Sequence, residues 1–95
     1  MNVISRQRLY EFIKTHGDAE SSLAAWYSLT KKAEWKHLAD LKMDYPNADL
    51  VGDLTVFNIK GNDYRLIAYV NYRFREVLIK EILTHREYDR GKWKQ

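Results

Sequence analysis

Residues 53–93 read DLTVFNIKGNDYRLIAYVNYRFREVLIKEILTHREYDRGKW. This stretch contains three runs of apolar, β-branched and aromatic residues, separated only by residues 61–63 (Gly-Asn-Asp) and 73–75 (Arg-Phe-Arg). Such runs with short breaks are typical of antiparallel strands joined by tight turns. The stretch therefore predicts a three-stranded antiparallel meander, and the rest of the chain must cover one of its faces.

Two stretches in the N-terminal half have the apolar spacing of amphipathic helices. We expect one helix over residues 6–16 and another over residues 19–33. Ser5 and Asp18 precede them and are the expected N-caps. In each helix three residues at i, i+3 and i+4 form one apolar stripe: Leu9, Phe12 and Ile13, then Leu23, Trp26 and Tyr27.

Shorter segments complete the expected fold. Residues 2–5 (NVIS) favour an added strand, and Trp35, Leu38 and Leu41 indicate a short third helix before the break at Pro46. The class is therefore α+β, with two N-terminal helices and a short third one packed on one face of an antiparallel sheet. We expect one domain over residues 1–95, because the chain has no repeat or linker.

Composition excludes several classes of function. The absence of cysteine excludes disulfides and thiolate chemistry and fits a cytoplasmic protein. The three histidines are scattered and no cysteine is present, which argues against a structural zinc site. No other metal or cofactor is expected. No apolar run reaches the ~18 residues that a membrane span needs, and the N-terminus is too polar for a signal peptide.

The net charge of +3 is unevenly placed. Residues 1–52 hold seven Lys/Arg and seven Asp/Glu, whereas residues 53–95 hold nine and six, so the whole excess lies on the meander and its tail. A basic sheet with aromatic residues suggests a polyanionic partner such as RNA. A surface with an incidental excess of positive charge is an equally good interpretation of the charge alone.

Strand geometry predicts which side chains lie together. Side chains alternate between the two faces of a strand, so the middle strand has one core face and one outer face. The expected turns place Lys60 opposite Tyr64. The core face is predicted to carry Tyr64, Leu66, Ala68, Val70 and Tyr72, and the outer face Arg65, Ile67, Tyr69, Asn71 and Arg73.

The same turns place Arg65 opposite Leu83 and Lys80 near Ala68. Lys60 and Arg65 then meet Thr84-His85 at one end of the sheet, and Tyr88 and Asp89 follow closely. Arg73 falls at the other end, because eight strand residues span roughly 26 Å. The candidate site is therefore Lys60, Arg65, His85, Tyr88 and Asp89.

This set of side chains suits phosphoryl chemistry without a metal ion. An arginine supplies fixed donors for a phosphorane, and a histidine exchanges protons near neutral pH. A tyrosine stacks on a base or assists proton transfer, and Asp89 orients His85 or Tyr88 or acts as a base.

Structural roles compete with these interpretations. A lone histidine is usually structural, an arginine on a sheet commonly forms a surface ion pair, and Asn62 suits a turn. Residues 90–94 (RGKWK) are a frayed tail or a basic arm that contacts phosphate.

Four segments together resemble the HigB toxins of bacterial toxin–antitoxin modules. They are residues 56–59 (VFNI), 61–67 (GN-x-YRLI), 84–89 (TH-x-EYD) and 92–93 (KW). Trp35 and residues 45–52 (YPNADLVG) are also similar, so the likeness covers nearly the whole chain. The joint occurrence of the second and third segments is the specific feature.

The resemblance implies a RelE-like fold with a curved sheet, and a type II toxin that cleaves mRNA, often on the ribosome, and stops translation. It implies neutralisation by a HigA-type helix-turn-helix antitoxin. In the implied metal-independent mechanism Arg65 stabilises the phosphorane, and His85, Tyr88 and Asp89 share the acid, base and orienting roles. The predicted RNA-binding residues are Lys60, Asn62, Arg73, Lys80 and Lys92.

Two alternatives remain open at this stage. ParE-like proteins share the fold but inhibit DNA gyrase, and fold alone does not settle function. A non-catalytic RNA-binding module would also explain the basic sheet. Mapping of RNA cleavage and of DNA damage separates the three.

Overall fold

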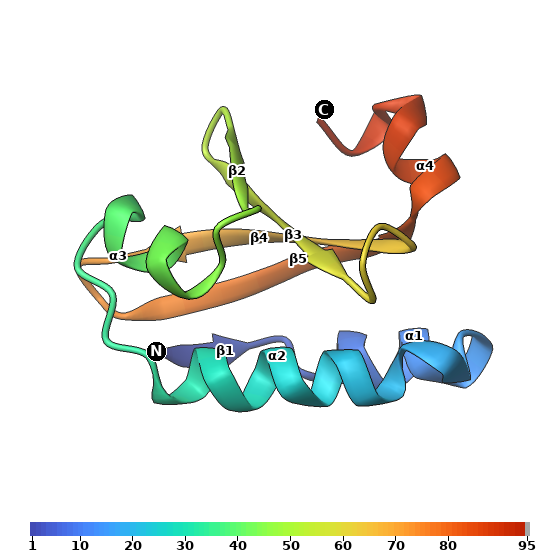
Figure 1. Cartoon of the computed structure of the whole chain (residues 1–95), viewed down its shortest axis with the longest axis horizontal. Coiled ribbons are helices and arrows are strands. Elements are labelled where there is room, and N and C mark those ends of the chain that lie inside the picture. Colours follow the sequence, from blue (N-terminus) through green and yellow to red (C-terminus); the bar gives the residue numbers. More distant parts are fainter. Residues whose placement is uncertain (95) are drawn as a thin grey trace.

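The computed structural model describes residues 1–94. One five-stranded sheet, in the order β1-β5-β4-β3-β2, has α1 and α2 on one face, while α4 lies on the other side at one end (Figure 1). This is the predicted α+β arrangement. The strands are β1 (Asn2–Ile4), β2 (Asp49–Val51), β3 (Leu54–Ile59), β4 (Tyr64–Asn71) and β5 (Glu76–Thr84), and the helices are α1 (Gln7–Thr15), η1 (Gly17–Ala19), α2 (Glu20–Lys32), α3 (Leu38–Asp44), α4 (His85–Arg90) and η2 (Lys92–Lys94).

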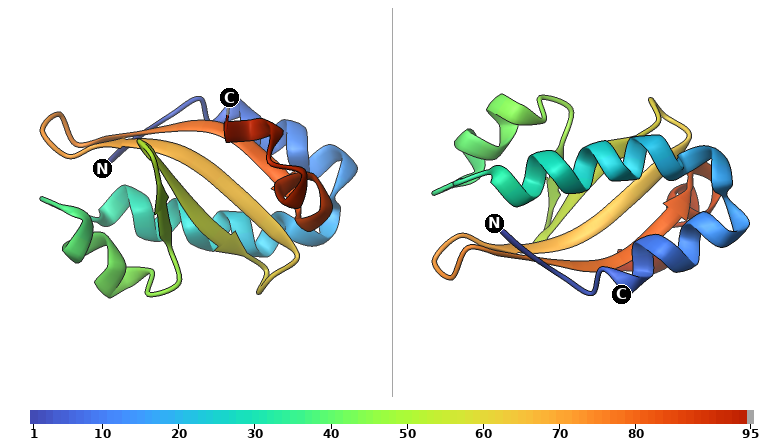
Figure 2. Two further views of the ribbon diagram at one scale, coloured as in Figure 1. Left: turned by 90° about the horizontal axis from the view of Figure 1, so that it is seen from above. Right: turned by 90° about the horizontal axis from the view of Figure 1, so that it is seen from below.

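The meander of β3, β4 and β5 is antiparallel, as predicted. The expected N-terminal strand is present as β1, but it pairs with β5 in parallel, so the sheet is mixed. The short strand β2 was not predicted. It forms a hairpin with β3 across a turn in which Gly52 has a φ of +60°, a conformation that favours glycine. Figure 2 shows the twist and curvature of the sheet above the two long helices.

The principal core lies between the sheet and α1 and α2. The predicted core face of β4 is confirmed: Tyr64, Leu66, Ala68 and Val70 are buried in this core, and Tyr72 packs at its margin. Phe57 of β3 is fully buried and contacts the rings of both Trp26 and Tyr45 edge-on. The helices therefore cover one face and leave the outer face for other contacts.

The helices match their predicted positions to within a few residues, but both predicted N-caps are wrong. Ser5 has a φ of +70°, and its side chain makes no capping hydrogen bond to α1. Asp18 lies in η1, and its carboxylate accepts hydrogen bonds from Lys60 and Tyr64 rather than capping α2. A tertiary contact has replaced the local one at this position.

The C-terminal segment forms a second, smaller core on the outer face. Trp93 of η2 is 7% exposed and packs with Val56 and Ile67, and Ile67 is only 1% exposed. Ile67 therefore lies on the outer face, as predicted, but the C-terminal segment covers it there. Of the two interpretations of residues 90–94, the frayed tail is excluded at Trp93, because burying an indole ties the segment to the sheet.

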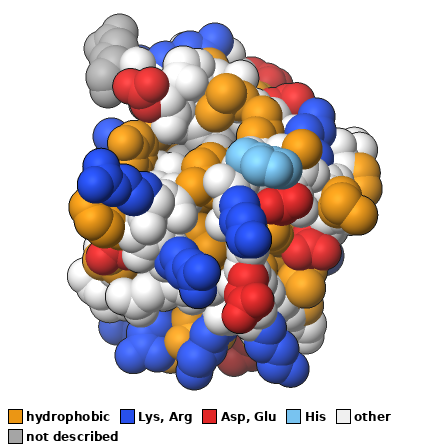
Figure 3. Space-filling model, turned by 90° about the vertical axis from the view of Figure 1, so that its left-hand side faces the viewer, with side chains coloured by type: hydrophobic (Ala, Val, Ile, Leu, Met, Phe, Trp, Pro, Cys, Tyr) orange, Lys and Arg blue, Asp and Glu red, His pale blue; other side chains and the backbone are white. Residues whose placement is uncertain are grey.

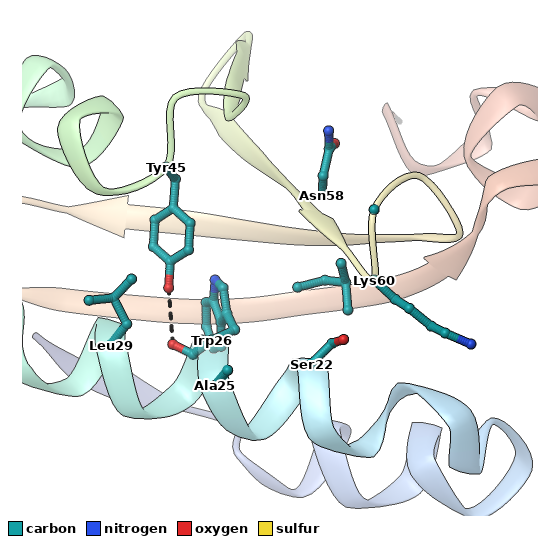
Figure 4. Close-up of a pocket in the computed structure, with 9 residues that line it drawn as sticks. Ser22, Ala25, Trp26, Leu29, Tyr45, Asn58 and Lys60 are labelled. Carbon is teal, nitrogen blue, oxygen red and sulfur yellow. Dashed lines mark hydrogen bonds between the residues drawn. The ribbon is translucent and has the colours of Figure 1, made fainter.

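Tyr45 provides a test of the principal core. Its hydroxyl lies 3.1 Å from Thr30 Oγ1 and donates to the Trp26 carbonyl at 3.2 Å (Figure 4). Burial raises the pKa of Tyr45 to about 12, partly offset by the hydrogen bond to Thr30. The folded state therefore holds this proton more tightly than the unfolded chain, whose tyrosines ionise near 10.

We expect Tyr45→Phe to reduce the free energy of unfolding by about 1 kcal/mol at neutral pH. The wild-type contribution is complete below pH 10 and is lost as the pH rises toward 12, so the difference between wild type and variant shrinks over that window. Urea unfolding between neutral and alkaline pH measures this. Tyr10→Phe, which changes an exposed tyrosine, is the control. If the difference in the free energy of unfolding between wild type and Tyr45→Phe stays constant with pH, the raised pKa is wrongly assigned to Tyr45.

Candidate functional site

The turn between β3 and β4 is one residue longer than predicted. Ile59 pairs with Tyr64 and Asn58 pairs with Arg65, so Lys60 belongs to the turn and not to the strand. Lys60 and Gly61 have φ values of +52° and +65°. Asn62 lies in the turn, as its structural interpretation predicts, but Lys60 and Gly61 supply the positive φ values. The backbone carbonyl of Asn62 accepts a hydrogen bond from Arg65 at 3.0 Å.

The turn between β4 and β5 is also one residue longer than predicted, and Asn71 pairs with Glu76. The register then shifts by one residue, because Ala68 pairs with Ile79 and Ile67 pairs with Glu81. Lys80 is thus the extra residue of a β-bulge, and the predicted pairing with Ala68 is wrong. The bulge cancels the error in the turn, so Arg65 pairs with Leu83 as predicted.

Helix α4 positions three of the candidate residues and was not predicted. The Thr84 hydroxyl accepts from the Glu87 N–H at 3.2 Å, and the Glu87 carboxylate accepts from the Thr84 N–H at 2.9 Å. Gly91, with a φ of +74°, ends the helix. The sequence Thr-x-x-Glu followed by Gly contains both signals, a capping box and a C-terminal glycine. They place His85, Tyr88 and Asp89 on one helix of six residues.

Arg65 lies on the outer face of the sheet beneath Tyr88. Its guanidinium donates to the carbonyls of Asn62 and Tyr64 at 3.0 and 3.1 Å, and its central carbon lies 5.2 Å from the centre of the Tyr88 ring. Tyr88 in turn stacks on Trp93, with ring centres 5.0 Å apart, and Trp93 Nε1 donates to the Tyr88 carbonyl. These contacts fix the guanidinium while leaving it half-buried at the rim.

His85 and Asp89 form a pair on the exposed side of α4. His85 Nδ1 lies 2.9 Å from Asp89 Oδ2, one helical turn away, and more than half of each side chain is exposed. The backbone N–H of His85 also donates to the backbone carbonyl of Asp63 at 3.1 Å. This bond ties the start of α4 to the turn before β4. A carboxylate at Nδ1 favours the tautomer that leaves Nε2 free for proton exchange.

Lys60 does not join this group. Its ammonium lies 2.8 Å from the Asp18 carboxylate, and the Tyr64 hydroxyl donates to the same carboxylate at 2.7 Å. Hydrogen bonds from Lys60, then Tyr64, hold the pKa of Asp18 below its usual value, and Asp18 raises the pKa of both partners. In Figure 4 the Lys60 side chain points away from Asn58. Its partner Asp18 lies in η1.

The other predicted RNA-binding residues lie at different places. Arg73 lies in the β4–β5 turn with its guanidinium over the Phe74 ring, at the opposite end of the sheet from α4. Figure 3 shows that end, where Lys and Arg side chains are mixed with acidic ones. Lys80 and Lys92 are exposed and line one pocket on the outer face.

Neither a metal centre nor a membrane span is found in the part of the chain that the structure describes. Residues 1–94 contain no group of three or more His, Cys, Asp or Glu side chains placed to hold a metal ion. None of the helices in residues 1–94 is long and apolar enough to cross a membrane.

The rim cluster of Arg65, His85, Tyr88 and Asp89 combines three chemical functions. The guanidinium offers planar donors to a phosphate, the imidazole can give or take a proton, and the aspartate orients the imidazole. The tyrosine holds the guanidinium by a cation–π contact. Such a set can stabilise and protonate the groups of a phosphodiester.

Comparison with known proteins places this chain in a class. Residues 19–91 match a family described as the RelE-like toxic component of a toxin–antitoxin system. That match spans more than half of the chain, so the molecule is a RelE-like toxin. The chain belongs to the HigB toxin family, as its sequence motifs predict, and a toxin of this kind has a cognate antitoxin.

Similar proteins span nearly the same length. The mRNA interferase toxin HigB of Escherichia coli K12 is 29% identical over 92 residues, which cover 94% of this chain and 88% of the relative. The mRNA interferase HigB of Shigella flexneri gives the same values. The mRNA interferase HigB of Escherichia coli O6:H1 is 26% identical over 93 residues, covering 95% and 90% of the two chains.

Proposed function

We propose that this protein is an mRNA endoribonuclease that stops translation by a metal-independent cleavage of the RNA backbone. The observation that carries the proposal is that one helix, α4, holds Tyr88 over the Arg65 guanidinium and also carries the His85–Asp89 pair. The names of its relatives, mRNA interferases, support the same activity. Arg65, His85, Tyr88 and Asp89 are the proposed catalytic group.

The proposed reaction uses the RNA's own nucleophile. The ribose 2′-hydroxyl gives its proton to a base among His85, Tyr88 and Asp89, and its oxygen forms a bond to the adjacent phosphorus. The bond from phosphorus to the 5′-oxygen breaks, and that oxygen takes a proton from an acid in the same group. Charge develops on the non-bridging oxygens, where the Arg65 donors stabilise it. His85 transfers a proton and Asp89 holds its ring. Tyr88 positions Arg65 and offers a hydroxyl near the same phosphate.

The antitoxin partner follows from the family, and we propose that it is a HigA-type helix-turn-helix protein. We further propose that the toxin acts in the cytoplasm on mRNA, on the ribosome in particular, where translation exposes single-stranded message. The exposed rim cluster accommodates a strand that lies across the outer face. Asn62, Lys80 and Lys92 are the candidate RNA contacts on this side, whereas the ion pair of Lys60 with Asp18 disfavours that lysine.

Controlled expression tests the proposal. We expect growth arrest within one generation, loss of protein synthesis with mRNA cut at defined sites, and rescue by the antitoxin encoded beside the toxin. Mapping of RNA 5′ ends measures the cleavage, and a reporter of DNA damage tests the gyrase alternative. Arrest with DNA damage and intact mRNA contradicts the nuclease and favours the ParE-like activity.

A further inference from the structure

A cationic pocket lies on the outer face of the sheet beyond Trp93. It has a volume of about 310 Å³, and Leu54, Ile67 and Trp93 provide its apolar surface. Arg8 of α1, Lys80 of β5 and Lys92 of η2 supply the cationic groups. Elements far apart in the sequence therefore build one pocket, which we call the Lys80–Lys92 pocket.

The positive charge of the pocket is poorly compensated. Glu81 is the acidic residue among those that line it, against three cations. None of Arg8, Lys80 and Lys92 takes part in the ion pairs found within residues 1–94. A concave surface with an excess of unpaired cations attracts an anion, because the walls focus the field of the charges.

The bulge in β5 creates part of this pocket. Ile79 faces the principal core, and without the bulge Lys80 would face outward and Glu81 inward. The extra residue instead pairs Glu81 with Ile67 on the outer face, so both Lys80 and Glu81 line the pocket. The local irregularity therefore changes the chemistry of the surface as well as its register.

The pocket adjoins the rim cluster. Ile67 follows Arg65 by two residues on the same face of β4, a separation of roughly 7 Å along the strand. Trp93 lines the pocket and stacks on Tyr88, which lies over Arg65. A nucleic-acid strand with one phosphate at Arg65 can therefore place a neighbouring phosphate in the pocket.

We propose that the Lys80–Lys92 pocket binds a backbone phosphate of the RNA strand next to the scissile phosphate. The proposal rests on the proposed function, because that function places the scissile phosphate of the RNA at Arg65. Lysine ammonium groups act as point charges on phosphate oxygens, so the contact fixes the position of the RNA without reading its sequence.

Binding of uncleavable RNA tests the pocket. Fluorescence anisotropy measures the affinity for a short and a longer single-stranded RNA with 2′-O-methyl riboses. For wild type we expect the longer RNA to bind more tightly. In the double variant Lys80→Gln with Lys92→Gln, we expect the ratio of the affinities for the longer and the shorter RNA to fall about tenfold. The slope of log affinity against log salt concentration should fall by about 1 in magnitude.

Two matched variants control for charge and fold. Lys80→Arg with Lys92→Arg should keep the gain in affinity with RNA length, because the cations remain. Lys36→Gln with Lys42→Gln should also keep it, because these exposed lysines lie just before and within α3.

If the Lys80/Lys92 glutamine variant binds long RNA as tightly as wild type, the pocket proposal is wrong, whether or not the protein cleaves RNA. If wild type shows the lysine-dependent gain but cuts no RNA, the pocket stands and the proposed function fails. If the glutamine variant loses only neutralisation by the antitoxin, the pocket binds an acidic protein segment and the RNA assignment is overturned.

Discussion

Arg65→Ala should lower the rate of RNA cleavage by about 10²- to 10³-fold, the usual effect of removing one donor from a preorganised group that stabilises an anionic transition state. The guanidinium is already fixed by the Asn62 and Tyr64 carbonyls and by the Tyr88 ring. Little reorganisation is then needed when charge develops on the phosphate. Single-turnover cleavage of a defined RNA measures the loss.

Arg65→Lys is the informative companion variant. It retains the charge but loses the planar donors, so we expect most of the activity to be lost in both variants. Arg86→Ala removes an exposed arginine from α4 and should change the rate by no more than a few-fold. Thermal unfolding identifies variants that remain folded. A folded Arg65→Ala protein that cleaves RNA at the wild-type rate refutes the assignment of Arg65.

His85→Ala should lower the cleavage rate by about 10²- to 10⁴-fold, because a positioned proton-transfer group is removed. The imidazole exchanges a proton with the reacting oxygens while Asp89, 2.9 Å from Nδ1, holds the ring. We expect Asp89→Asn to have a smaller effect, because the amide oxygen retains one hydrogen bond. Rates measured between pH 5 and 9 separate a loss of proton transfer from a loss of binding.

His37 offers a matched control for His85. It is also an exposed histidine beside an aspartate, with Nδ1 3.8 Å from Asp40 Oδ2, but it lies at the start of α3, away from the rim cluster. His37→Ala should cleave RNA with the wild-type rate and pH profile. Equal losses in both histidine variants would mean that the effect comes from charge or stability and not from catalysis.

The sequence predicts the fold because its patterns are periodic. Each pattern defines one apolar face that must pack toward the core. Examples are the i, i+3, i+4 stripe of Leu23, Trp26 and Tyr27 and the alternation along residues 64–72. The parallel pairing of β1 with β5 was not predictable in the same way, since a strand of three residues carries no signal of direction. The two N-caps failed for a related reason. Asp18 has a stronger tertiary partner in Lys60 than any local backbone N–H.

The candidate site was predicted in part. The pairing of Arg65 with Leu83 emerged correctly only because the bulge at Lys80 cancels the extra residue in the β4–β5 turn. No bulge is visible in the residue pattern of β5. The turn before β4 was misjudged because Lys60 adopts a positive φ that lysine rarely takes, which moves Lys60 from the strand to the turn. By contrast, α4 was missed although Thr84, Glu87 and Gly91 are its recognisable start and end signals.

The chemistry of the cut ends tests the central claim most directly. Purified protein is incubated with a defined RNA in excess EDTA, and mass spectrometry identifies the fragment termini. Attack by the 2′-hydroxyl predicts a 2′,3′-cyclic phosphate, or the monophosphate formed from it, on the upstream fragment and a 5′-hydroxyl on the downstream one. Substrate with a 2′-deoxyribose at the cut site should stay intact. Fragments with a 3′-hydroxyl and a 5′-phosphate, or cleavage that requires a divalent cation, would contradict the assignment of Arg65 and His85 to a metal-independent transfer.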